Sequence, residues 1–404
     1  MARTDRQPRW IATRAPIFAT TTATFAATFA LGAALAPGAA HAGAIERAVP
    51  APSRILFEEG RYAEVGLSFT DPDQSGGDAN LAALGGPDAI IPGNTGDLFE
   101  DHWSYSAAFK DQITDRWSYV LAFDQPYGAD TQYGAGSFPA GVFSYDGTNA
   151  DLNTYQLSAI VAYDATPNIK VFGGARAQRL DASAAIPFIG PPTLPGYTVD
   201  ADADWGYGYL LGAAYHIPEI ALRVALTYHS KIGHSLDTSE FDSIAIPGVQ
   251  DGGTTTDIDT PQSVALEFQT GVMANTLVFG SIRWVDWSEF SIAPPTYTAL
   301  TGRDLVDYSE DWWTYNLGAA YQFTDDLAAS FSVTWEPSVG GELTTLGPSD
   351  GRTTANVGVS YDYGKANFAG GVSYGTLGDT TNVLGTDFND GSVWAAGLRI
   401  GYSF

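Results

Sequence analysis

The chain has 404 residues and a formal net charge of −27 at pH 7, from 19 lysines and arginines against 46 aspartates and glutamates. This balance excludes nucleic acid as a partner, because binding a phosphate backbone requires clustered Lys and Arg side chains. The chain has no cysteine, so hydrogen bonds and packing must hold it together without disulfides. Its length would suit two domains, but a large β-barrel of this size is also a single domain.

The N-terminus has the three parts of a secretory signal peptide. Arginines precede residue 15, a mostly apolar stretch follows to Ala36, and Ala40-His41-Ala42 ends it. We therefore expect cleavage after Ala42 and exclude residues 1–42 from the fold. The sequence after Ala42 has no run of about 18 apolar residues, so a chain that spans a membrane would have to do so with strands.

From residue 61 onward, apolar and polar side chains alternate in segment after segment, which is the pattern of a β-strand with two unlike faces. The predicted strands are residues 62–69, 103–109, 117–123, 155–163, 169–175, 205–215, 222–228, 264–268, 278–287, 313–323, 329–335, 357–361, 368–374 and 394–404. Residues 43–60 show no such alternation and contain Pro50 and Pro52, so we expect a short irregular segment there.

Long and short connections alternate strictly between these segments. The long connections are residues 71–98, 127–150, 181–203, 232–260, 288–311, 337–352 and 377–390. This rhythm, the even number of strands, and Trp and Tyr at strand ends are typical of bacterial outer-membrane barrels, which have short periplasmic turns and long external loops. We therefore predict an all-β fold, in which residues 61–404 form a 14-stranded antiparallel transmembrane barrel in a Gram-negative outer membrane.

The last segment, from Gly391 to Phe404, favours the same fold. Trp394, Ile400 and Phe404 share one face, and small or polar residues occupy the other. A strand of this kind that ends in Phe is typical of the closing strand of an outer-membrane barrel. The alternative is a soluble all-β protein with many short strands, which would need neither a signal peptide nor this rhythm of loops.

Three stretches resemble one family of barrels. The run Ile55-Leu56-Phe57-Glu58-Glu59-Gly60-Arg61-Tyr62 resembles the approach to the first strand in the FadL-type family of long-chain fatty acid and hydrocarbon transporters. The run from Phe279 to Phe290 is similar to the ninth strand of that family, and Asn316 to Tyr321 is similar to its tenth. Together with the strand count, the resemblance covers nearly the whole chain after residue 42.

The resemblance implies a route for a hydrophobic ligand. The ligand would land on external loops, enter a pocket in the barrel, and leave through a side opening near a kinked strand or past an N-terminal hatch. Typical members have a longer hatch with an Asn-Pro-Ala element, whereas residues 43–60 are few and contain no Asn. We therefore expect a short hatch-like segment and leave open whether it plugs the lumen and where the kink lies.

Two of the long connections gather apolar residues. The residues predicted to contact the ligand are Ile186, Phe188, Ile189 and Leu194 in the first, and Phe241, Ile244 and Ile246 in the second. Loops that face water rarely collect such side chains, and an exposed apolar patch usually marks a binding surface. The alternative is that these residues pack the two loops against each other, and the two interpretations are compatible.

A ligand that carries a carboxylate would need a cation inside the lumen, because an unpaired anion in an apolar pocket is costly. Arg176 and Arg223 are opposite in phase to the apolar faces of their strands and should point inward, and Arg283 lies beside Trp284 in the family-like run. We predict that these arginines bind the headgroup, with Arg176 and Arg223 foremost. The alternative is an internal salt-bridge network, for which the candidate partners are Glu64, Asp124, Glu267 and Asp286.

Enzyme and metal sites have little support. The histidines fall at unrelated strand ends and loops, with no recognisable nucleophile beside them. The Asp-rich runs at 200–204 and 257–259 lack the spacing and the closing Glu of a calcium loop, so they favour a solvated acidic rim. We expect no catalytic residue, no metal and no cofactor.

The sequence therefore predicts a monomeric barrel, in contact with outer-membrane lipid, for passive, ligand-gated uptake of a hydrophobic small molecule. Long-chain fatty acids are the foremost candidate cargo, and aromatic hydrocarbons are not separated from them. One alternative is a general diffusion porin, which would show a polar constriction loop with facing acidic and basic clusters. A barrel-anchored enzyme or adhesin is the other.

Overall fold

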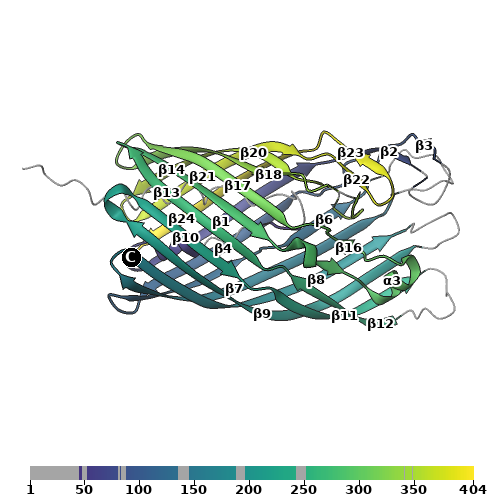
Figure 1. The fold of residues 1–404 in the computed structure, drawn as a ribbon, viewed down its shortest axis with the longest axis horizontal. Coiled ribbons are helices and arrows are strands. Elements are labelled where there is room, and N and C mark those ends of the chain that lie inside the picture. Colours follow the sequence, from purple (N-terminus) through teal and green to yellow (C-terminus); the bar gives the residue numbers. More distant parts are fainter. Residues whose placement is uncertain are drawn as a thin grey trace, which may run out of the picture.

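Seventeen strand segments close into one antiparallel sheet, whose first and last members, β1 and β24, pair with each other (Figure 1). The structure is a computed structural model that describes residues 45–47, 52–80, 82, 88–134, 145–187, 196–242, 252–340, 342–347 and 349–404. The expected signal peptide, residues 1–42, lies outside the described residues.

The segments of the barrel follow one another around the wall in chain order. They are β1 (Tyr62–Asp73), β4 (His102–Gln112), β5 (Trp117–Asp124), β6 (Gly128–Gln132), β7 (Asn149–Thr166), β8 (Ile169–Ile186), β9 (Tyr197–Ile217), β10 (Leu222–His229), β11 (Ile232–Asp242), β12 (Gly252–Thr260), β13 (Ser263–Met273), β14 (Thr276–Val285), β17 (Trp312–Gln322), β18 (Leu327–Glu336), β20 (Arg352–Tyr363), β21 (Ala366–Leu377) and β24 (Ser392–Ser403). In three places two segments continue one another, namely β5 with β6, β10 with β11, and β12 with β13. The barrel therefore has the 14 strands that were predicted.

Side chains alternate between the outer surface and the lumen. On β9, the Tyr207 side chain is 74% exposed on the outer face, whereas that of Leu210 is 2% exposed in the interior. Large apolar side chains face outward in the same way on the other strands, as lipid contact requires. Among the described residues, no helix is both long enough and apolar enough to cross a membrane.

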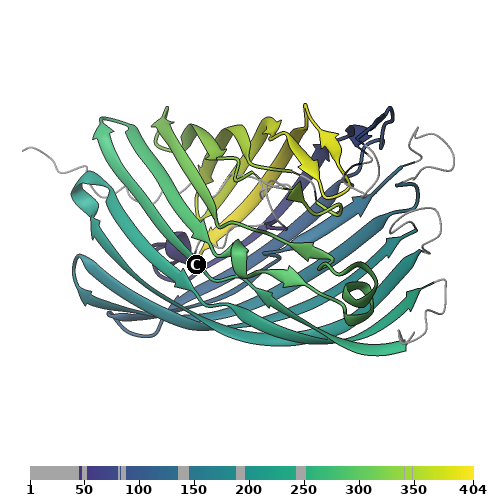
Figure 2. The ribbon, with the colours of Figure 1, turned by 45° about the vertical axis from the view of Figure 1, so that its right-hand side comes forward.

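On one side of the barrel, the strands extend further toward the external end than the sequence predicted, which makes the wall taller there. The expected loops at residues 181–203 and 232–260 are wrong, because β8, β9, β11 and β12 run through most of both (Figure 2). On β11, Leu236 is buried, whereas Asp237 and Ser239 are exposed on the outer face. This part of the wall stands beyond the lipid, so its apolar face turns inward and its polar face meets water. The apolar residues of these stretches therefore belong to strands more than to loops.

The long connections form structure of their own at the external end of the barrel (Figure 1). Segments β2 (Gly76–Asn80), β3 (Ile90–Ile91), β19 (Glu342–Leu343), β22 (Thr380–Asn382) and β23 (Thr386–Phe388) make a separate five-stranded sheet. The connection between β14 and β17 holds η4 (Trp287–Glu289), β15 (Ser291–Ile292), α3 (Pro295–Thr301) and β16 (Val306–Asp307). Near the other end, α2 (Pro52–Leu56) lies inside the barrel, and η3 (Pro218–Ile220) forms part of a short turn.

Candidate functional site

The external half of the lumen contains a cavity of about 50 Å³, which we call the apolar pocket. Its wall is the inner face of the taller strands, and its roof is the connection between β14 and β17 together with residues 342–347. Representative lining residues are Leu152, Val199, Ile258, Ile292, Leu305 and Tyr308. Among its described lining residues there is one carboxylate, Asp151, and no lysine or arginine. A concave site of this composition suits an apolar group.

Glu240, near the external end of β11, fixes the roof. Its buried carboxylate accepts hydrogen bonds from the Tyr197 hydroxyl at 2.6 Å and from the backbone N–H groups of Thr296 at 3.0 Å and Tyr297 at 3.2 Å. It also accepts one from the Thr254 hydroxyl at 2.6 Å. The first N–H groups of a helix have no partner within the helix, so this carboxylate satisfies them. The start of α3 is thereby attached to the barrel wall.

Aromatic rings fill the space beneath the roof. The ring centroid of Trp287 lies 5.4 Å from that of Tyr308 and 5.8 Å from that of Tyr127, and both pairs meet edge to face. Such pairs add to the stabilisation that burial provides. Burial, and to a lesser degree Asp307, raises the pKa of the Tyr308 hydroxyl, so Tyr308 is a neutral donor at the edge of the apolar pocket.

The barrel wall has a kink in its third strand, between β5 and β6. Phe123 faces Leu157 on β7, but Ala129 faces Leu152, so the register shifts by one residue across Gln125-Pro126-Tyr127. Pro126 has no N–H to donate to a neighbouring strand, and an inserted residue bends the strand. The kink, which the sequence did not place, therefore lies at residues 125–127.

The kink leaves a gap in the wall beside β4. β4 pairs with β5 only from Ala107 to Gln112. Nearer the external end, the Gln125 side-chain oxygen accepts a hydrogen bond from the Tyr105 backbone N–H at 2.8 Å. The gap forms a cavity of about 500 Å³, which we call the wall groove. Its lining includes Arg47, His102, Trp103, Asp130 and Tyr155. Trp103 and Tyr105 are 50% and 53% exposed, so the groove meets the outer surface of the barrel.

Residues Ile45, Glu46 and Arg47, which we call the N-terminal strand, lie along the kink inside the barrel. The Arg47 N–H donates to the Pro126 carbonyl at 2.9 Å, and the Gly128 N–H donates to the Ile45 carbonyl at 2.8 Å. Ile45 lines the apolar pocket and Arg47 lines the wall groove. The two cavities also share Ala150 and Asp151 in their linings. The N-terminal strand therefore stands where the two cavities adjoin.

Two ion pairs hold the N-terminal strand, one of them buried and the other partly buried. The Arg47 guanidinium pairs with Asp130 on β6, and the Glu46 carboxylate pairs with Arg283 on β14. Arg47 also lies against Gly128, where a Cβ atom would come within 2.2 Å of the guanidinium. Arg283 was a predicted site residue, whereas Glu46 and Arg47 were missed, because nothing in their local sequence points to partners so far along the chain.

The three predicted arginines face the lumen but contact different groups. Arg176 donates to the Gln156 side-chain oxygen at 2.7 and 3.1 Å and to the Ser230 carbonyl at 3.0 Å. Arg223 donates to Gln269 at 2.8 Å, toward the periplasmic end. Arg283 binds Glu46 through Nη2, and its Nε and Nη1 have no hydrogen-bond partner among the described residues. None of the three lines the apolar pocket. The described contacts of Arg176 and Arg223 have no partner in common, and their binding of one headgroup stays a prediction.

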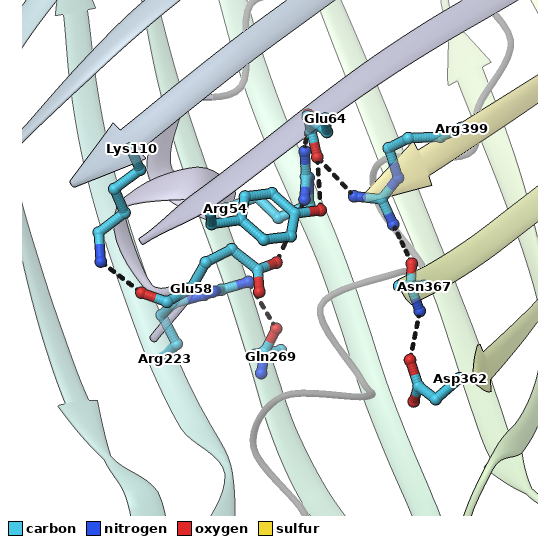
Figure 3. Close-up of polar contacts among 10 residues, drawn as sticks. Arg54, Glu58, Glu64, Lys110, Arg223, Gln269, Asp362, Asn367 and Arg399 are labelled. Carbon is cyan, nitrogen blue, oxygen red and sulfur yellow. Dashed lines mark hydrogen bonds and ion pairs between the residues drawn. The ribbon is translucent and has the colours of Figure 1, made fainter. Parts of the chain in front are cut away.

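The periplasmic half of the lumen holds α2 in a network of charged side chains (Figure 3). Arg54 pairs with Glu58 at 3.3 Å and with Glu64 on β1, and Glu64 also binds Arg399 on β24 at 3.2 Å. Lys110 on β4 donates to the Glu58 carbonyl. Each charge in this network has a partner of opposite sign or a carbonyl, as buried charges require.

Further contacts reach the opposite wall. The Ser53 hydroxyl donates to Glu267 on β13. The Phe57 ring lies 4.9 Å from the Arg223 guanidinium carbon on β10 and 5.1 Å from the His216 ring on β9. The segment around α2 is therefore attached to strands on both sides of the lumen.

The predicted loop residues are only partly described. Ile186 is buried in the core cluster that includes Leu152 and Tyr197, and Phe241 is 54% exposed at the end of β11. Phe188, Ile189, Leu194, Ile244 and Ile246 lie outside the described residues. The described roof comes instead from residues 286–311 and 342–347. The adjacent Pro294 and Pro295, which lie between Phe290 and Tyr297 in the sequence, are a signal that could have drawn attention to this connection.

No metal site accompanies these cavities: the described part of the chain contains no group of three His, Asp or Glu side chains placed to hold an ion. A closed 14-stranded barrel with an apolar pocket and a gap in its wall defines a transmembrane protein of the outer-membrane type. The chain belongs to the family described as outer membrane protein transport protein (OMPP1/FadL/TodX), whose model matches residues 10–376. It is therefore an outer-membrane transport protein.

Solved structures share the fold at low sequence identity. A Pseudomonas aeruginosa FadL homologue is 16% identical, with a TM-score of 0.68 over 87% of this chain and 92% of that one. The Pseudomonas putida toluene transporter TodX is 14% identical, with a TM-score of 0.61 over 88% and 93%. The Ralstonia pickettii toluene transporter TbuX is 16% identical, with a TM-score of 0.59 over 86% and 90%. No curated protein sequence matches the chain.

Proposed function

We propose that this protein takes up hydrophobic molecules from outside the cell by passive diffusion, with long-chain fatty acids as its main cargo. The observation that carries the proposal is the arrangement of the two cavities. The apolar pocket and the wall groove share Ala150 and Asp151, and the three-residue N-terminal strand stands between them. Cargo that has left water for the pocket would then pass through the wall to the lipid.

The fatty-acid cargo is supported by the position of Arg283. Arg283 and Val285 face the lumen from the same side of β14, and Val285 belongs to the core cluster around the apolar pocket. Two residues along a strand span about 7 Å. A carboxylate at Arg283 would therefore leave its hydrocarbon chain directed into the pocket. The unpartnered Nε and Nη1 groups offer hydrogen bonds to such a headgroup.

An uncharged hydrocarbon is the second candidate cargo. The described lining of the apolar pocket contains no cation, and the Arg283 guanidinium already forms an ion pair with Glu46. Two of the similar solved structures are toluene transporters. For a neutral cargo, the arginines of the lumen would be purely structural.

The charged network around α2 supports a hydrophobic rather than a polar cargo. A porin needs an open polar path through the lumen, whereas here the segment around α2 is attached to strands on both sides of it. We therefore propose that this segment plugs the periplasmic half of the barrel, and that cargo leaves sideways through the wall groove.

Uptake by intact cells tests the proposal. The protein would be expressed in cells that lack their own hydrophobic transporter, and uptake of labelled oleate, labelled toluene and a labelled sugar would be compared with that of cells without it. Saturable oleate uptake is the expected result. Toluene uptake alone would select the second candidate, and sugar uptake would contradict both. The proposal includes removal of residues 1–42 during export, which mass measurement of the mature protein checks.

A further inference from the structure

Glu46 places a carboxylate where an anionic cargo would place its own. The Glu46 side chain is 6% exposed, and its carboxylate binds Nη2 of Arg283, which is itself 3% exposed. A guanidinium has five N–H groups that can donate to carboxylates, so Glu46 uses only part of the hydrogen-bonding capacity of Arg283. Val285 lies on the same face of β14, on the side of the apolar pocket.

Removing Glu46 would leave Arg283 without its carboxylate partner. Arg176 lies near enough to Arg283 for the two charges to repel each other. The Asp124 carboxylate also lies near Arg176, but the described hydrogen bonds of Arg176 go to neutral oxygens of Gln156 and Ser230. His229, which is also buried nearby, has no hydrogen-bond partner among the described residues. An uncompensated buried cation is costly, so the site would bind another anion in place of Glu46.

We propose that Glu46 is an internal substitute for the cargo headgroup, and that a carboxylate cargo binds by taking its place on Arg283. This inference rests on the proposed function above. Because Glu46 belongs to the N-terminal strand, its release removes one of the two ion pairs that hold this strand between the pocket and the groove. A neutral cargo has no group to exchange with Glu46 and leaves that ion pair intact. The exchange therefore makes passage selective for carboxylates.

The test compares oleate with oleyl alcohol, which has the same chain but no charge. Each ligand competes with a bound fluorescent fatty-acid analogue on the purified full-length protein in non-ionic detergent. The quantity measured is the ratio of the two dissociation constants, because partitioning into detergent is the same for every variant and cancels between variants. Glu46→Gln keeps the shape of the side chain and removes its charge. We expect it to shift the ratio toward oleate by about ten-fold.

Arg47→Gln is the matched control. It also cuts one ion pair of the N-terminal strand, so it loosens the strand without removing the anion on Arg283. The ratio in Arg47→Gln should stay that of the wild type, and the double variant Glu46→Gln with Arg283→Gln should lose the shift. Correct folding of each variant is checked by its heat-modifiable migration on gels.

An unchanged ratio in Glu46→Gln, or an equal shift in Arg47→Gln, would overturn the inference and leave the proposed function in place, provided that the ligands bind saturably. If neither ligand binds the wild-type protein saturably, the proposed function itself is wrong.

Discussion

The carboxylate of Glu240 accepts the backbone N–H of Thr296 at 3.0 Å, and so joins the barrel wall to the helix that roofs the apolar pocket. Glu240→Ala would leave this N–H group and the Tyr197 hydroxyl without their acceptor, at a cost of about 1–3 kcal/mol. We expect α3 to detach more often, so that trypsin cleaves faster after the exposed Arg303. Mass analysis of fragments from intact cells measures this rate.

Glu289→Ala is the control for that experiment, because Glu289 is an exposed acid in the same connection. It should leave the rate of cleavage unchanged. Equal rates in the two variants would show that Glu240 does not hold the roof.

The N-terminal strand can be locked in place by a disulfide. Glu46 and Tyr127 face each other across an antiparallel bridge as a non-hydrogen-bonded pair, whose Cα atoms are typically about 4.5 Å apart. This separation is within the range that a disulfide spans, and the chain has no other cysteine. In the double variant Glu46→Cys with Tyr127→Cys, we expect cargo uptake to stop under oxidising conditions and to return when a reductant is added. Equal uptake in both states would mean that the strand need not move.

Gly128 gives room to Arg47. A valine at this position would place Cβ 2.2 Å from the guanidinium, so the Arg47–Asp130 pair would have to break. We expect Gly128→Val to expose the backbone amides of residues 45–47, with faster hydrogen exchange measured by mass spectrometry. Gly134→Val is the matched control, because a Cβ atom at Gly134 meets nothing within 4 Å. Unchanged exchange in Gly128→Val would count against the docked position of the strand.

The plug can be probed through Arg54. Arg54→Ala removes the cation shared by Glu58 and Glu64 and leaves two buried carboxylates near each other, which disfavours the docked position of α2. We expect measurable ion conductance across planar bilayers that contain Arg54→Ala. Arg61→Ala, whose side chain is 55% exposed and pairs with Asp111, should remain as closed as the wild type. A silent Arg54→Ala channel would show that other residues block the lumen.

A charged side chain on the outer face should lower the stability of the barrel more in the lipid-facing part of the wall than in the part beyond the lipid. Leu211 is 55% exposed on the lipid-facing part of β9, so Leu211→Arg should cost up to about 2–4 kcal/mol of unfolding free energy near the middle of the bilayer. Ser239→Arg, on the outer face of β11 beyond the lipid, should cost almost nothing. Urea unfolding followed by gel migration measures both, and equal losses would place Ser239 in the membrane.

The membrane part of the barrel was predictable because every lipid-facing strand repeats the same alternation. The strands around Leu211 or Val359 carry apolar side chains outward at every second position, so the count of 14 could be obtained by reading one face. The upper wall was missed for a related reason. At Leu236 and Ile258 the apolar side chains face the interior, which is the reverse of the lipid-facing strands. Because the prediction looked for apolar side chains on the outer face, it assigned these stretches to loops.

The candidate site was harder to predict, because its contacts join distant parts of the chain. Glu46 lies 237 residues from Arg283, and Arg47 lies 83 residues from Asp130. Neither pair shows any periodicity, and an isolated Glu-Arg dipeptide in an irregular segment predicts nothing by itself. Arg176 and Arg223 were correctly placed in the lumen by phase alone, but phase does not tell at which height a side chain lies or what it meets.

The bulge on β9 has a consequence for how this protein can evolve. Leu180 faces Asp204, whereas Ala182 faces Ala201, so one extra residue separates the part of β9 that begins at Trp205 from the part above it. Below this joint, outward positions are constrained by lipid, and above it they are constrained by water, while the inward positions there shape the pocket. An inserted residue uncouples the two registers. The part of the barrel wall beyond the bulge can therefore change to bind a new cargo, while the membrane-spanning part keeps its fit to the lipid.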